Sequence, residues 1–381
     1  MPDSLNLRKT QRYPNFVQLR INSILIKLDM HKVKGYILIS GSHILEYNRM
    51  AELGIGKIRG LQQISTPGGI FIMCAMDHRG SLKAMIEKEQ LDDEVDYQEL
   101  VEYKLELCDA LAPYSSAVLL DPNYGAAQCI SRGALPGHTG LLVSIEATGY
   151  ESTRLGRITA LLNNWSVEKI RRMGASAVKL LVYYRPDLNE VANKQLKTIQ
   201  MVAEECLKYD VPFLVETQTY PIKGENEETS KLAARKPGLV IETARQIASL
   251  PIDVLKSEFP ADLRYEVDRA KLLQYCRQLD EATPVPWGIL SAGVEYETFR
   301  KEVEIACSAG ASGFLGGRAI WQEIVHFTDK KDRLKFLSTT VVDRLKELAD
   351  IATKHATPWY RKLGIKADEL AVIPENWYVN Y

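Results

Sequence analysis

The sequence lacks an excess of charge of either sign. Its 381 residues include 48 Lys and Arg against 49 Asp and Glu, a formal net charge of -1. A nucleic-acid-binding surface needs a basic excess, so we expect no nucleic-acid partner. The chain also lacks an apolar run long enough to span a bilayer, and its hydrophobic content of 46% argues against disorder. The polar start, Met1 to Ser4, does not resemble a signal peptide.

Cysteine and histidine are scarce and show no metal-site spacing. The six cysteines, at 74, 108, 129, 206, 276 and 307, include no C-x-x-C pair, and none lies near a pair of histidines. Buried free thiols in a reducing compartment are the ordinary interpretation of such cysteines. We therefore expect a cytoplasmic protein with no metal site.

Eight short apolar runs follow one another after residue 70. Each is continuous rather than alternating, which is typical of parallel strands buried on both faces. The runs are Phe71–Ala75, Ala117–Leu120, Leu141–Ile145, Ala177–Val182, Pro212–Val215, Ile252–Leu255, Trp287–Leu290 and Gly313–Leu315. Helical patterns separate them, so eight strand–helix units in about 250 residues predict a (β/α)8 barrel. A doubly wound sheet with a second domain is the alternative, although no linker or composition shift marks one.

The helical patterns also set the expected domain organisation. The clearest helices are expected at Tyr97–Leu111, Lys194–Tyr209, Val267–Leu279 and Glu297–Ser308. We expect one barrel over residues 50–381, including a C-terminal helical tail with a pattern at 333–355. A helix over about 47–62 is expected to cap the barrel floor. Residues 1–49 are an extension without an assigned role, alternating in part like strands at 17–28 and 36–39.

Two lysines interrupt otherwise apolar strands. Lys179 lies within the fourth run and Lys256 follows the sixth, whereas a strand lysine usually lies at a solvated edge. Burial beside a second cation lowers the pKa of a lysine, and a neutral amine attacks a carbonyl to form a Schiff base. Imine formation also needs proton transfer. Glu216, after the fifth run, and Asp77, after the first, are placed to supply it.

Small residues follow the last two strands. The segments 291–293 (Ser-Ala-Gly) and 316–318 (Gly-Gly-Arg) occupy loops that commonly form the phosphate site of a barrel. Glycine lets backbone N–H groups approach an anion, and arginine binds a phosphate with two parallel hydrogen bonds. Ordinary turn glycines are the alternative. Together with the lysines, these loops predict a carbonyl substrate that carries a phosphate or a similar anion.

Six stretches in chain order carry a family signature: 75–83, 177–184, 212–216, 253–256, 290–294 and 316–319. With Thr357–Tyr360 near the end, they resemble the class I tagatose 1,6-bisphosphate aldolases. The related sulfofructose phosphate aldolases belong to the same wider group. The resemblance runs from about Ile55 to Tyr360. It implies a (β/α)8 barrel and reversible aldol cleavage through a lysine imine, without a metal or a cofactor.

The resemblance implies a role for single residues. It assigns imine formation to Lys256, acid–base chemistry to Glu216, and orientation of the substrate to Lys179 and Asp77. The family pattern has glutamine where this chain has His78, a departure that bears on the substrate rather than on the imine. Groups expected to bind the substrate or its anionic end are Arg79, His78, Ser291, Gly293, Gly317 and Arg318.

Three functions are consistent with this sequence. The leading hypothesis is cleavage of tagatose 1,6-bisphosphate to dihydroxyacetone phosphate and glyceraldehyde 3-phosphate. A sulfonate at the distal end would make the substrate 6-deoxy-6-sulfofructose 1-phosphate and the aldehyde product sulfolactaldehyde. A barrel that senses sugar phosphates without turnover is the third, and the intact set of catalytic residue types argues against it. A homodimer is a further hypothesis, because exposed barrel helices often pair.

Overall fold

The computed structural model describes residues 53–90, 94–153, 156–225, 229–366, 373, 375–379 and 381, and before them five short strands. The chain divides into two units, Met1–Glu52 and Leu53–Tyr381. In the first, β1 (Arg8–Lys9), β2 (Phe16–Ile21) and β3 (Ile24–Asp29) form an antiparallel sheet, and β4 (Ile37–Ile39) pairs with β5 (His43–Leu45). Strands are thus present in both segments expected to alternate like strands, 17–28 and 36–39, but β2 pairs with β3 and β4 with β5 rather than the two segments with each other. Tyr36 lies outside the described residues.

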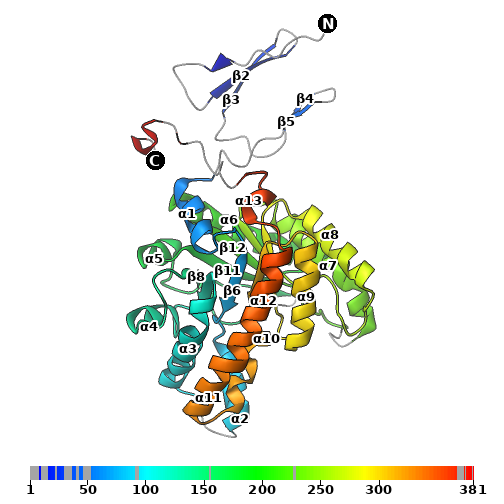
Figure 1. Cartoon of the computed structure of the whole chain (residues 1–381). Helices are drawn as coiled ribbons and strands as arrows, with labels where there is room; N and C mark the ends of the chain where they lie inside the picture. The colour runs from blue at the N-terminus through cyan, green and yellow to red at the C-terminus, as the bar shows by residue number, and fades with distance from the viewer. Residues whose placement is uncertain are drawn as a thin grey trace. The chain divides into compact units, whose positions relative to one another are not determined.

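The second unit is a closed barrel of eight parallel strands in the order β11-β12-β13-β14-β15-β6-β7-β8, surrounded by helices (Figure 1). The predicted (β/α)8 barrel is therefore confirmed, and the doubly wound alternative is wrong. The strands are β6 (Phe71–Ala75), β7 (Ala117–Leu120), β8 (Gly140–Ser144), β11 (Ala177–Tyr183), β12 (Phe213–Gln218), β13 (Val254–Ser257), β14 (Trp287–Leu290) and β15 (Gly313–Gly316).

The strands alternate between the inside of the barrel and the helix layer. In β6, Phe71, Met73 and Ala75 belong to one buried cluster, while Ile72 and Cys74 belong to another. Successive strand side chains point to opposite faces, so one cluster fills the interior and the other joins the strands to the helices. Both faces are buried, which is why the sequence shows continuous apolar runs.

The helices match the expected ones with shifted ends. The main ones are α2 (Gly80–Gln90), α3 (Tyr97–Leu111), α6 (Asn189–Lys208), α7 (Ser230–Ile247), α8 (Arg269–Ala282), α9 (Tyr296–Ser308) and α12 (Val342–His355). The shorter ones are α1 (Ile55–Gln63), α4 (Ala126–Ser131), α5 (Val167–Arg172), α10 (Arg318–Trp321), α11 (Lys330–Phe336) and α13 (Trp359–Lys362). A π-helical turn at Leu337–Val341 joins α11 to α12, so the tail pattern at 333–355 is two helices.

The floor helix begins later than the sequence pattern predicts. The carboxylate of Asp210 accepts hydrogen bonds from the backbone N–H groups of Gly56 (2.5 Å) and Lys57 (3.3 Å) at the start of α1. A carboxylate at this position satisfies amide groups that have no partner within the helix, so the helix starts where Asp210 reaches it. Residues 46–52 lie outside the described part of the chain.

None of the helices that the structure describes is both long enough and apolar enough to cross a lipid bilayer.

Candidate active site

Five charged residues at the carboxyl ends of the strands continue the interior rows of the barrel. Lys179, Glu216 and Lys256 each lie two residues beyond an interior apolar residue on β11, β12 or β13. Asp77 lies two residues beyond Ala75 at the end of β6, and Glu146 lies four residues beyond Leu142 of β8. Because strand side chains repeat every two residues, this parity directs all five toward the barrel axis.

The five side chains form one buried chain of ion pairs. The ammonium of Lys179 lies 2.7 Å from Asp77 Oδ2, 2.6 Å from Glu146 Oε1 and 3.1 Å from Glu216 Oε2. Lys256 Nζ lies 2.9 Å from the same Glu216 Oε2. The pairing of β12 with β13 sets Glu216 directly beside Lys256. The structure therefore brings together the four predicted catalytic residues and adds Glu146.

The ion pairs shift the pKa values in this cluster in opposite directions. Burial alone would raise the pKa of Asp77 and of Glu216, but the nearby Lys179 and Lys256 outweigh it and hold both pKa values below the ordinary range. Burial would lower the pKa of Lys179, but Asp77, Glu146 and Glu216 raise it well above its usual value. Lys179 is therefore a fixed ammonium at neutral pH, unsuited to attack a carbonyl.

Glu146 is a residue of this cluster that the sequence analysis missed. Its Oε1 accepts a hydrogen bond from Lys179, and its Oε2 accepts one from the backbone N–H of Leu181 at 3.2 Å. The side chain is buried. Glu146 lies an even number of residues beyond the interior residues of β8, so strand alternation predicts that its side chain faces the barrel interior. The apolar run itself ends before Glu146.

A second missed residue, Lys104 of α3, supports the loop after β6. Its ammonium donates hydrogen bonds to the carbonyl oxygens of Met76 and His78 and lies 2.9 Å from Asp121 Oδ2. Lys104 and Asp121 are fully buried. The two carbonyls flank Asp77, so Lys104 fixes the segment that aims this carboxylate at Lys179.

The loops after β14 and β15 meet over the barrel mouth. Ser291 Oγ accepts a hydrogen bond from the backbone N–H of Gly317 at 3.2 Å. Ala292 and Gly293 have φ angles of 47° and 75°, a left-handed turn that glycine adopts without strain. A Cβ on Gly293 would lie 3.1 Å from the guanidinium carbon of Arg318. The turn thus lets Arg318 approach the backbone closely.

Arg318 and His78 each carry a buried nitrogen that has no partner among the described residues: Nε in Arg318 and Nδ1 in His78. The His78 ring packs edge-on against Trp321, with ring centroids 5.1 Å apart, and its Cε1 would lie 2.9 Å from a Cβ on Gly317. Burial holds the pKa of His78 well below its ordinary value, with Arg318 acting in the same direction. His78 is therefore a neutral ring beside the two loops.

Arg79 is already engaged by the protein. One terminal nitrogen donates to Asn123 Oδ1 at 3.2 Å, and the other donates to the backbone carbonyl of Glu146 at 2.8 Å. Arg79 therefore ties the loop after β6 to the end of β8, and its predicted contact with substrate stays a prediction.

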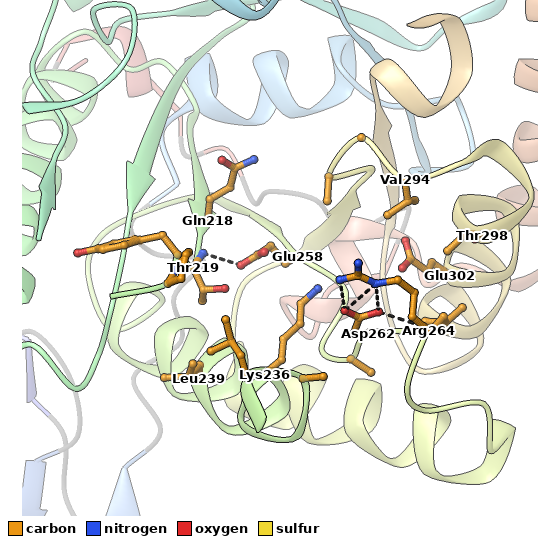
Figure 2. Close-up of a pocket in the computed structure, with 18 of the residues that line it drawn as sticks. Gln218, Thr219, Lys236, Leu239, Glu258, Asp262, Arg264, Val294, Thr298 and Glu302 are labelled. Atoms are coloured by element: carbon orange, nitrogen blue, oxygen red, sulfur yellow. Dashed lines mark hydrogen bonds and ion pairs between the residues drawn. The ribbon is translucent and has the colours of Figure 1, made fainter. Parts of the chain in front are cut away.

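A cavity of about 710 Å³ opens beside this cluster. Residues after the ends of β12, β13 and β14 line it, together with residues of α7 and α9 (Figure 2). Gly293 and Arg318 also belong to the lining. The ion-paired lysines lie outside its lining. Within the described part of the chain, no three His, Cys, Asp or Glu side chains group as metal ligands.

Comparisons with known proteins identify the family of this chain. The family model described as "DeoC/LacD family aldolase" matches residues 71–323. A curated tagatose 1,6-diphosphate aldolase of Lactococcus lactis subsp. lactis is 34% identical over 325 residues, covering 81% of this chain and 98% of the relative.

Two solved structures share the fold. A fructose-bisphosphate aldolase from Plasmodium falciparum aligns with a TM-score of 0.62 at 11% identity, covering 82% of this chain and 97% of that one. An archaeal fructose-1,6-bisphosphate aldolase, described with its catalytic lysine bound to the carbinolamine intermediate, aligns with a TM-score of 0.50 at 22% identity, covering 77% and 98%.

Proposed function

Because this chain belongs to the DeoC/LacD family of aldolases, we propose that it cleaves a phosphorylated ketose reversibly through an imine on Lys256. The observation that carries the proposal is the unequal sharing of carboxylates in the barrel mouth. Among the described residues, Lys179 faces three of them, whereas Lys256 has one ion-pair partner, Glu216, at 2.9 Å. Lys256 is the amine whose single partner is also a proton acceptor.

The reaction begins when the ammonium of Lys256 passes a proton to its partner Glu216, and the resulting amine attacks the C2 carbonyl of the ketose. The resulting carbinolamine loses water to form a protonated imine, and Glu216 carries the protons for this dehydration. The bond between C3 and C4 then breaks as the 4-hydroxyl loses its proton, which releases the aldehyde product. The electron pair moves into the imine as an enamine, and protonation and hydrolysis free the ketone product. The imine does the work that a Lewis-acid metal would otherwise do.

Lys179, Asp77 and Glu146 act as a fixed charged frame in this proposal. The ammonium of Lys179 and the carboxylate of Asp77 orient the hydroxyl groups of the open-chain sugar. Glu146 holds Lys179 in place through its 2.6 Å ion pair and its hydrogen bond to the β11 backbone. Groups held in advance of the reaction lower its barrier because they need no rearrangement as charge develops.

We propose that the loops after β14 and β15 bind one anionic end of the substrate. Ser291 and the backbone of Gly293 and Gly317 line the loops, and the unpartnered Nε of Arg318 supplies a charged donor. His78 adds a neutral nitrogen that can meet a substrate hydroxyl. This binding site suits a phosphate and a sulfonate alike.

Tagatose 1,6-bisphosphate is the substrate that we propose, with dihydroxyacetone phosphate and glyceraldehyde 3-phosphate as products. The supporting observation is the 34% identity, over 98% of its length, to a relative named for that substrate. His78, which stands where the family pattern has glutamine, is the observation that keeps 6-deoxy-6-sulfofructose 1-phosphate as a second candidate.

A panel of ketoses tests this proposal. Tagatose and fructose 1,6-bisphosphates and 6-deoxy-6-sulfofructose 1-phosphate are each mixed with the protein, and release of dihydroxyacetone phosphate is followed. We expect the fastest cleavage with tagatose 1,6-bisphosphate, no loss of activity with EDTA, and none of this activity in Lys256→Ala. Binding of every ketose without cleavage would identify a sensor instead, and full inhibition by EDTA would refute the imine mechanism.

We also propose that the protein works in the reducing cytoplasm. All six cysteines are buried free thiols, and burial raises the pKa of Cys74 and of Cys307 to about 12. Such thiols are unreactive and suit a compartment that forms no disulfides.

A further inference from the structure

The cavity beside the barrel mouth contains a lysine to which the proposed chemistry assigns no task. Lys236 projects from α7 into the space between Glu258 and the pair formed by Asp262 and Arg264 (Figure 2). It is half-buried. Among the residues that the structure describes, Lys236 forms no hydrogen bond and no ion pair, although four acidic side chains line the same cavity.

Two of these acidic side chains, Asp262 and Glu258, are engaged by other groups. Asp262 Oδ2 lies 2.7 Å from a terminal nitrogen of Arg264, and the carboxylate also accepts from the Nε of that side chain. Glu258 accepts a hydrogen bond from the backbone N–H of Thr219 at 2.6 Å. Among the described residues, Lys236 therefore has no carboxylate in contact as a counter-charge, although its charge is near enough to help lower the pKa of Asp262.

Glu302 of α9, which also lines the cavity, does not supply that counter-charge. Burial raises its pKa to about 8, and the neighbouring Asp262 and Glu258 act in the same direction while Lys236 opposes them. At neutral pH, Glu302 is therefore mostly a neutral acid that can donate a hydrogen bond. A cationic lysine and a neutral acid facing one space form a surface that favours an anion.

The substrate class proposed above has a second anion that the loops after β14 and β15 leave unbound. A ketose bisphosphate carries a phosphate at each end, and Arg318 holds only one of them. Arg79, the other arginine predicted to bind substrate, already donates to Asn123 and to the carbonyl of Glu146. The cavity reaches from Arg318 to Lys236, and its volume of about 710 Å³ lies within the range of small-molecule sites.

We propose that Lys236 binds the second anionic group of the ketose, in the cavity that Arg318 also lines. This inference rests on the proposed function and extends it by naming a residue that determines specificity. It makes Lys236 a group that contacts the substrate at a distance from the reacting carbons. The shared chemistry is a phosphate or a sulfonate on the last carbon of the sugar.

The kinetic test compares Lys236→Met with Lys231→Met, a control on the same helix whose lysine is exposed and lies outside the cavity. Each variant is assayed with tagatose 1,6-bisphosphate, with 6-deoxy-6-sulfofructose 1-phosphate, and with tagatose 1-phosphate, which lacks the second anion. For Lys236→Met we expect kcat/KM to fall by about 10- to 100-fold on the doubly anionic ketose that the wild type prefers, mainly through KM. On tagatose 1-phosphate we expect a change below about two-fold, and the control should be unaffected throughout.

An equal fall on all three ketoses, or no fall on any, would overturn the assignment of Lys236. Recovery of part of the lost affinity in Lys236→Arg would support it, because arginine keeps the charge. The assays with the bisphosphate and with the sulfonate show which anion Lys236 contacts, because the larger loss of kcat/KM marks the group that Lys236 binds.

A binding arm separates this inference from the proposed function. Calorimetric titrations use Lys256→Ala and Lys256→Ala/Lys236→Met, which do not form the imine, with the same three ketoses. We expect the second substitution to weaken binding of a doubly anionic ketose by at least about 10-fold and binding of tagatose 1-phosphate hardly at all. If the wild type cleaves no ketose, the proposed function fails, but the two binding titrations still measure whether Lys236 contributes to ketose binding. If neither variant binds any doubly anionic ketose, the inference on Lys236 is wrong.

Discussion

Both ends of the barrel bury a lysine, but the two ends use it differently. At the floor, Lys57 of α1 lies 2.7 and 3.0 Å from the two carboxylate oxygens of Asp253, just before β13. Asp253 also accepts a hydrogen bond from the backbone N–H of Phe213 at 2.8 Å. One cation meets one anion, and the pair is buried with its charge balanced. The floor is therefore a closed structural contact.

At the mouth, two lysines share three carboxylates. Lys179 contacts all three, and Lys256 shares only Glu216 with it. The sharing is unequal, so one amine is held by three carboxylates while the other has a single ion-pair partner among the described residues. Burial of a lysine is common to both ends and identifies neither as catalytic. The arrangement of its partners distinguishes them.

The largest effects should come from replacing a lysine with methionine at each end of the barrel. Lys256→Met at the mouth should reduce aldol cleavage by at least about 10⁴-fold, because it removes the nucleophile. The free energy of unfolding should change by no more than about 1 kcal/mol, since Glu216 keeps Lys179 as a partner. Steady-state assays and urea denaturation measure the two quantities. A large loss of stability with activity retained would contradict the assignment.

Lys57→Met at the floor should have the opposite result, a loss of stability with little change in kcat. It leaves the carboxylate of Asp253 buried without its cation, which costs about 3–5 kcal/mol in stability. The kcat of the folded fraction should stay within about two-fold of the wild type, because the floor does not contact the substrate. Urea denaturation and active-site titration with the ketose check this pair of results. A loss of kcat in fully folded protein would remove the distinction between the two ends.

Glu146→Gln should have a smaller effect, confined to the mouth. The amide keeps the shape but removes one of the three negative charges around Lys179, and we expect kcat to fall by about 10- to 100-fold. KM should change little, because Glu146 acts through Lys179. Glu168→Gln, at an exposed glutamate on α5, is the matched control. A wild-type kcat in Glu146→Gln would show that Asp77 and Glu216 hold Lys179 without it.

The smallest effect should come from His78→Gln and should depend on pH. The pKa of His78 lies below its unfolded value of about 6.5, so the folded state takes up fewer protons than the unfolded state. Wild-type stability is therefore lost as pH falls below about 6.5, by up to about 2 kcal/mol at pH 5. His78→Gln removes this loss, and denaturation at pH 5 and pH 8 measures it. An identical pH dependence in both proteins would show that His78 does not titrate as a buried ring.

The barrel and most of its mouth could be predicted from sequence because they rest on local patterns. Continuous apolar runs indicate strands buried on both faces. Lys179 within such a run and Lys256 directly after one are anomalies visible without a structure. The end of β13 was less predictable. The run predicts Ile252–Leu255, yet the ladder to β14 extends the strand to Ser257, where Ser257 pairs with Ile289.

The residues that the sequence analysis missed depend on contacts between distant segments. Lys57 and Lys104 lie on helices, where a lysine is ordinary, and only the closed barrel sets them against Asp253 and Asp121. Glu146 follows its strand as any loop carboxylate would. The cavity of Lys236 is built from segments after three strands and two helices, so no single stretch of sequence predicts it.

The central claim is that Lys256, rather than Lys179, forms the covalent intermediate. The direct measurement is reduction with borohydride during turnover of tagatose 1,6-bisphosphate, followed by peptide mass spectrometry. The account predicts a single sugar adduct on the peptide that carries Lys256, absent from Lys256→Met, with Lys179 unmodified. An adduct on Lys179, or turnover without any trapped adduct, would contradict it.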